Sequence, residues 1–122
     1  MTLENVLSRI DADMPAATDR LLDLLRIPSI STDPAYKAEC DKAADWLVAD
    51  LKSIGIKAEK RPTPGHPMVV GHVEGAPDGN SPHVLFYGPD DGHPVDQLEL
   101  WDSEPFAPAI ADTHTDTVNG GR

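Results

Sequence analysis

The feature that most constrains the fold is a change of hydrophobic period at Gly55. Before Gly55, apolar residues recur three or four positions apart, which places them on one face of a helix. Asp33 can cap this helix, and Pro34 suits its first turn. After Gly55 the period is two: Ile56, Ala58 and Lys60 alternate with three charged residues at 57, 59 and 61, as in a half-exposed strand. The sequence therefore predicts one long helix, from Asp33 to Ile54, that packs on a sheet through a stripe made of Cys40, Ala43, Leu47, Leu51 and Ile54.

Further helices are predicted before this element and further strands after it. Residues 3–10 form a first apolar helical face, and Pro15 is placed to begin a second helix that Pro28 ends. Residues 68–73 read as a second strand and residues 83–87 as a third. The third is apolar nearly throughout, which predicts burial on both faces. The predicted class is α/β, with amino-terminal helices packed on a short mixed sheet.

The length and charge of the chain limit its organisation and its partners. A chain of 122 residues is long enough for one small domain. We expect a helical lead-in over residues 1–32, a helix plus strands over 33–110, and a divergent tail over 111–122. The 21 acidic residues outnumber the 10 basic ones and give a net charge of −11. This charge disfavours nucleic acids and anionic membranes as partners, because both are polyanions.

Cysteine usage and the start of the chain point to a reducing compartment. A single cysteine, Cys40, excludes an internal disulfide and a cysteine-based zinc site, and its place on the apolar stripe predicts a small core residue. Residues 1–10 lack both a basic region and an apolar run, so neither a secretory signal nor a membrane span is predicted. The expected location is cytoplasmic.

Two acidic segments carry residues that could bind a metal. The loop at 88–94 places Asp90, Asp91 and His93 directly after the apolar run, and carboxylate oxygen with imidazole nitrogen suits a hard or borderline cation. In the second segment His114 and Asp116 are two residues apart, which puts them on one face of an extended chain. The alternative readings are an acidic turn for the first segment and a polar tail for the second.

The remaining histidines carry weaker signals. His66 lies between a glycine and a proline in a turn, so we expect its side chain to face solvent. His72 lies near the end of a strand, where a structural role is expected. His83 opens the third predicted strand.

Five segments, in this order, resemble the amino-terminal part of a family of metallopeptidases. They are LLRIPSIST at 24–32, AADWLVADLKSIGI at 43–56, PGHPMVVGHVEG at 64–75, HVLFYG at 83–88 and PVDQLELWDSEPFAPAI at 94–110. The family is the twentieth of the metallopeptidases, which includes carnosinase-like dipeptidases, acetylornithine deacetylase and succinyl-diaminopimelate desuccinylase. The last segment is similar to the dipeptidase branch.

The resemblance implies a di-zinc, aminopeptidase-like catalytic domain. Two zinc ions would activate a water that cleaves a peptide or amide bond in a small peptide or N-acyl amino acid, with a glutamate as general base. Asp91 stands where the family has the aspartate that orients a zinc-ligating histidine. Pro89 stands in that histidine's position, and His93 comes four residues later. The segment from His114 to Asp116 is similar to the deacetylase form of the same motif.

These departures shape the functional expectation. No position in the chain matches the general base, so we expect a truncated or degenerate segment of a hydrolase that is inactive alone and binds zinc weakly or not at all. Two alternatives stay open: a non-catalytic binding domain that reuses the scaffold, and a locally altered sequence with an intact parent enzyme. An unpaired sheet edge would favour self-association.

Overall fold

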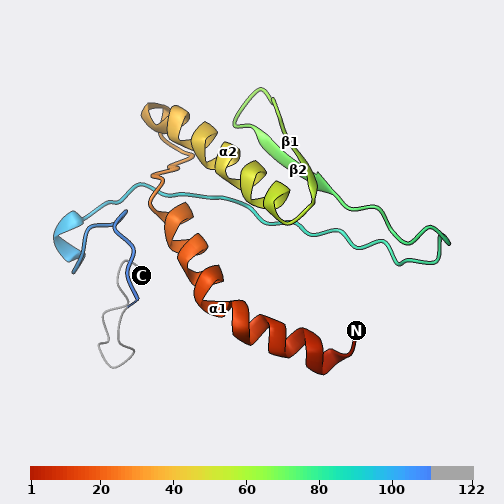
Figure 1. Ribbon diagram of the computed structural model, residues 1–122. Helices are drawn as coiled ribbons and strands as arrows, with labels where there is room; N and C mark the ends of the chain where they lie inside the picture. Colours follow the sequence, from red (N-terminus) through yellow and green to blue (C-terminus); the bar gives the residue numbers. More distant parts are fainter. Residues whose placement is uncertain (111–122) are drawn as a thin grey trace. The chain divides into compact units, whose positions relative to one another are not determined.

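The computed structural model describes residues 1–110, which fall into two compact units (Figure 1). Among the described residues, one unit contains Met1–Ile27 and residues 95–110, and the other contains Pro28–Pro94. No helix in the described part of the chain is long and apolar enough to cross a membrane. Because the candidate site lies within Pro28–Pro94, the fold of that unit is the more informative one.

The first unit is dominated by one helix, α1, which spans Leu3–Leu25. Thr2 caps it by accepting a hydrogen bond from the backbone N–H of Asn5 at 3.2 Å. Pro15 lies inside α1, so the predicted break into two helices is wrong. A proline removes a single backbone donor, and the turns on both sides keep theirs, so the loss stays local. A short 3₁₀ turn, η2, follows at Leu98–Leu100.

The second unit contains the predicted long helix. Asp33 accepts a hydrogen bond from the backbone N–H of Ala35 at 2.9 Å and begins a 3₁₀ turn, η1, at Pro34–Tyr36. The α-helix proper, α2, spans Lys37–Ser53. Gly55 follows with φ +87°, a left-handed conformation that suits glycine at a helix end. The prediction of a long helix that ends at Gly55 is confirmed, with a first turn of 3₁₀ geometry.

A two-stranded antiparallel sheet packs on α2. Strand β1 spans Lys57–Arg61, strand β2 spans Met68–His72, and Ala58 pairs with Gly71. The buried residues of this layer are small: Cys40, Ala43 and Ala44 on α2 and Ala58 on β1. Small side chains let a helix approach a sheet closely. The predicted stripe is therefore only partly right, because Leu47 is half-buried and Ile54 is 67% exposed.

An ion-pair cluster also links β1 to α2. Lys60 Nζ lies 2.7 Å from Asp45 Oδ1 and 2.9 Å from Asp41 Oδ2. These contacts, with Asp45 first, raise the pKa of Lys60. The side chain of Lys60 stays charged at neutral pH and holds the strand against the first half of the helix.

The third predicted strand is not formed. Val84, Leu85, Phe86 and Tyr87 are 61%, 88%, 91% and 86% exposed, and no strand among the described residues pairs with them. The sheet is thus antiparallel and two-stranded, not mixed. An apolar run indicates burial only where other layers cover both of its faces, and no such layers lie over it in the described residues.

Candidate functional site

The acidic loop at 88–94, here called the site loop, is anchored beside residues 29–31, which precede η1. Ile30, only 2% exposed, forms a parallel bridge with Gly92. The backbone N–H of Ser31 donates to the carbonyl oxygen of Gly92 at 3.1 Å, and the Ser31 hydroxyl donates to the same oxygen at 3.2 Å. A Cβ at position 92 would overlap the carbonyl oxygen of Ser29 and lie 2.9 Å from its carbonyl carbon. The close approach of the two segments therefore requires glycine at position 92.

The predicted acidic loop residues gather at this anchor. The Ser29 hydroxyl donates to Asp90 Oδ1 at 3.4 Å, and Asp91 Oδ1 lies 3.4 Å from the Ser31 hydroxyl, whose single proton it shares with the Gly92 carbonyl oxygen. His93 Nε2 lies 3.7 Å from Asp91 Oδ2, and both side chains are exposed. The structure thus brings Asp91 and His93 together on the surface, where protonation of the imidazole would create an ion pair.

His66 is a member of the site that the sequence did not reveal. Its Nε2 lies 2.6 Å from the carbonyl oxygen of Ser31, and its side chain is half-buried, so the expectation of a solvent-facing histidine is wrong. A carbonyl oxygen can only accept, so Nε2 carries the proton. Nδ1 is buried and has no hydrogen-bond partner among the described residues. No spacing rule could have joined His66 to Ser31, because 35 residues separate them.

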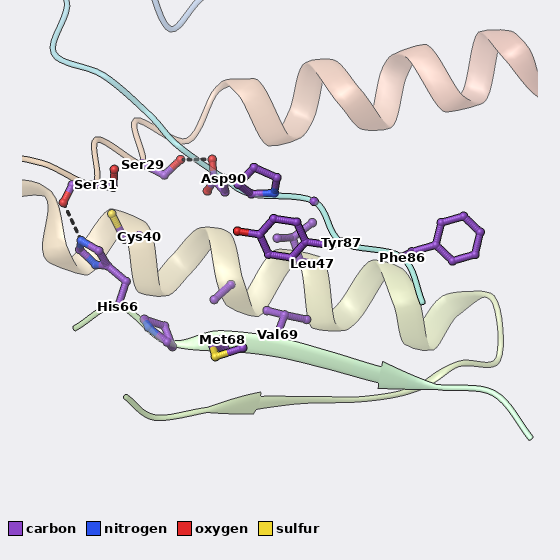
Figure 2. Close-up of a pocket in the computed structure, with 14 residues that line it drawn as sticks. Ser29, Ser31, Cys40, Leu47, His66, Met68, Val69, Phe86, Tyr87 and Asp90 are labelled. Atoms are coloured by element: carbon purple, nitrogen blue, oxygen red, sulfur yellow. Dashed lines mark hydrogen bonds between the residues drawn. The ribbon is translucent and has the colours of Figure 1, made fainter. Parts of the chain in front are cut away.

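A cavity of about 360 Å³ lies beside these contacts, between α2, β2 and the segment at 86–90 (Figure 2). Its volume is near the lower end of the range for small-molecule sites. The cavity is apolar at the centre and polar at one end. The apolar lining includes Cys40, Leu47, Met68, Val69, Phe86 and Tyr87, and the polar lining Ser29, Ser31, His66 and Asp90.

Cys40 faces this cavity without the chemistry of a nucleophile. Burial raises the pKa of its thiol, and the negative charge of Asp90 raises it further. The reactive form of cysteine is the thiolate, so a thiol held protonated near neutral pH is inert. This agrees with the prediction of a small core residue.

The donor set of the described residues does not fit zinc. No group of three or more His, Cys, Asp or Glu side chains among residues 1–110 could hold a metal ion. Asp91 and His93 supply two donors, whereas protein zinc sites use three or four side chains. His114 and Asp116, the other predicted ligands, lie outside the described residues. The roles predicted for all four residues stay predictions.

Comparisons with known proteins place the chain beside the dipeptidases. No protein-family model matches it. It is 28% identical to the Cys-Gly metallodipeptidase dug1 of Schizosaccharomyces pombe, over 87% of this chain and 24% of that protein. The same figures hold for the Cys-Gly metallodipeptidase DUG1 of Candida albicans. The solved structure of the di-peptidase Dug1p from Saccharomyces cerevisiae matches 90% of this chain with a TM-score of 0.76 and 28% identity.

The chain spans about a quarter of the length of these relatives. The resemblance to the metallopeptidase family is thus confirmed as partial homology, which extends over most of this chain.

Proposed function

Because this chain is homologous to a quarter of a metallodipeptidase, we propose that it corresponds to an amino-terminal segment of a zinc-dependent hydrolase with a degenerate metal site. The parent reaction would be cleavage of a dipeptide by a metal-activated water, and the chain alone would be inactive. The observation that carries the proposal is the structural match to Dug1p, with a TM-score of 0.76 over 90% of this chain.

The expected inactivity follows from the chemistry of the site loop. Pro89 occupies the position of a ligating histidine by resemblance, and a proline side chain has no lone pair to offer a metal. Asp91 retains its place as the residue that would orient such a histidine. Among residues 1–110, the Asp91–His93 pair alone leaves a metal short of protein donors, and no general base can be assigned there.

The test combines a zinc titration with a Cys-Gly hydrolysis assay on the purified chain. Pro89→His restores the missing donor, and Pro89→Ala is the matched control that removes the proline without adding one. We expect no hydrolysis by any form. We expect Pro89→His to bind zinc about tenfold or more tighter than Pro89→Ala, because Asp91 can orient the new imidazole.

Two results would contradict the proposal. One is zinc-dependent hydrolysis of Cys-Gly by the unaltered chain that disappears in Asp91→Ala. The other is equal zinc affinity in the two Pro89 variants, which would remove Asp91 from the orienting role.

The second candidate function is a non-catalytic binding module, which the cavity favours. Its apolar centre and polar end suit a small ligand that carries both characters. Under this alternative, Cys-Gly without zinc would raise the melting temperature and remain uncleaved. Leu47→Glu, at the apolar wall, would abolish that shift, while Glu at the exposed Leu98, which does not line the cavity, would not.

A further inference from the structure

The most exposed apolar feature of the Pro28–Pro94 unit is the segment at 83–88. Figure 1 shows it as an extended trace. In the described part of the chain, no backbone hydrogen bond joins residues 82–89 to another segment. Leu85 and Phe86, neighbours that point to opposite faces of an extended chain, are 88% and 91% exposed. Among the described residues, both backbone edges of the segment are thus unpaired, and each of its faces carries an exposed apolar side chain.

The composition of this segment favours β-strand formation and pairing with another strand. Valine, phenylalanine and tyrosine favour strands, and no charged residue lies between Asp78 and Asp90. Pro82 and Pro89 bracket the segment, and because proline has no N–H they confine a continuous ladder to the six residues between them.

We propose that this segment pairs with the same segment of a second copy of the chain, antiparallel and centred on Leu85. This proposal does not depend on the proposed function. In this register Leu85 faces its own copy, Val84 faces Phe86 and His83 faces Tyr87. Pairs of aromatic and β-branched residues across strands are favourable.

The charges beyond the ladder support a second copy as the partner. In the same register Asp90 lies opposite Asn80, Asp91 opposite Gly79, and Asp78 opposite Gly92. No carboxylate faces another carboxylate, so local repulsion is avoided. The net charge of −11 on each copy still opposes approach over longer distances. Association should therefore strengthen as salt rises, because salt screens that repulsion.

The size of the interface sets the expected affinity. In this register Gly88 faces Pro82, so the ladder covers residues 83–87 of each copy, and two such strands bury less than the roughly 1,200 Å² of a standard interface. The dimer should therefore be weak, and its population should rise steeply with concentration.

Sedimentation analysis across about a hundredfold range of concentration tests the association. The weight-average mass should rise from 13.1 kDa toward twice that value, and rise further at high salt. Leu85→Lys places like charges opposite each other and should keep the chain monomeric. Leu100→Lys makes the same change at another exposed leucine, 72% exposed, and should leave association unchanged. Circular dichroism checks that both variants keep their helices.

Disulfide trapping tests the register in a Cys40→Ala background. Leu85→Cys should form a linked dimer rapidly, because residues that face each other across strands have Cα separations suited to a disulfide. Val84→Cys, which faces Phe86, should link far more slowly.

The proposal is overturned by a monomer at every concentration and salt, by equal effects of the two lysine variants, or by equal trapping at positions 84 and 85. It is also overturned if amides 84–87 resist hydrogen exchange in a monomer, because the segment would then pair within its own chain.

Discussion

Replacement of Gly92 by alanine tests the anchor of the candidate site. The new Cβ would overlap the carbonyl oxygen of Ser29 and lie 2.9 Å from its carbonyl carbon, whereas ordinary van der Waals contact begins near 3.4 Å. Both atoms of Ser29 belong to the backbone, so no side-chain rotation relieves the overlap. The loop must move away from residues 29–31, and the parallel bridge between Ile30 and Gly92 must open.

The expected magnitude follows from the bonds that this movement breaks. Ser31 loses two hydrogen bonds to Gly92, one from its N–H at 3.1 Å and one from its hydroxyl at 3.2 Å. At about 0.5–1.5 kcal/mol each, the local opening free energy should fall by about 1–3 kcal/mol. Hydrogen exchange of the Ser31 amide should then accelerate about 5- to 150-fold. Native-state exchange measured residue by residue by NMR is the assay.

Gly88→Ala provides the matched control in the same loop. A Cβ at position 88 meets nothing within 4 Å, so this variant should leave exchange at Ser31 unchanged. Similar exchange at Ser31 in the two variants would refute the argument that close approach requires glycine at position 92. Equal acceleration throughout the unit would also refute it, because the effect would then be global.

Two further predictions concern the core and the thiol. Ile30→Ala should lower the free energy of unfolding by about 2–5 kcal/mol, because Ile30 is 2% exposed. Leu47→Ala should lower it by less than about 2 kcal/mol, because Leu47 is only half-buried. Urea denaturation compares the two variants, and a larger loss for Leu47→Ala would contradict this ranking. Because burial raises the pKa of the folded Cys40 thiol, the free energy of unfolding should fall as pH rises above about 8.5, where the thiol of the unfolded chain ionises. Cys40→Ala should reduce that fall. Melting curves from pH 7 to 10 measure it, and an identical fall in the variant would count against the burial of the thiol.

The parts of the fold that sequence predicted are those specified locally. The stripe beginning at Cys40 indicated a helix, Gly55 ended it in a left-handed conformation, and the alternation after Gly55 indicated a strand. Each of these signals lies within a few residues of the structure it produces. The predicted helix also included residues 34–36, which form the 3₁₀ turn η1 in the structure. A 3₁₀ turn and an α turn begin with the same capping residues, so the local sequence does not distinguish them.

The features that sequence missed depend on distant partners. Whether the run at 83–87 becomes a strand depends on a ladder partner and on covering layers, which its own residues do not encode. His66 joins the site through Ser31, 35 residues away, and Gly92 joins it through residues 29–31, about 60 positions away. The predicted proximity of Asp91 and His93 required no such contact, because the two residues are neighbours in one loop.

The location of these residues separates folding from catalysis. The core of the Pro28–Pro94 unit is formed by Ile30, Cys40 and a few alanines, all buried, whereas Pro89, Asp91 and His93 are exposed. Substitutions at exposed loop positions usually change stability by no more than about 0.5 kcal/mol. A donor side chain at position 89 could therefore be introduced or removed with little effect on folding. The chain can therefore match the fold of a dipeptidase with a TM-score of 0.76 although the donors in its described loop do not fit zinc. The buried residues determine the fold, and the exposed residues that could bind a metal do not contribute to that packing.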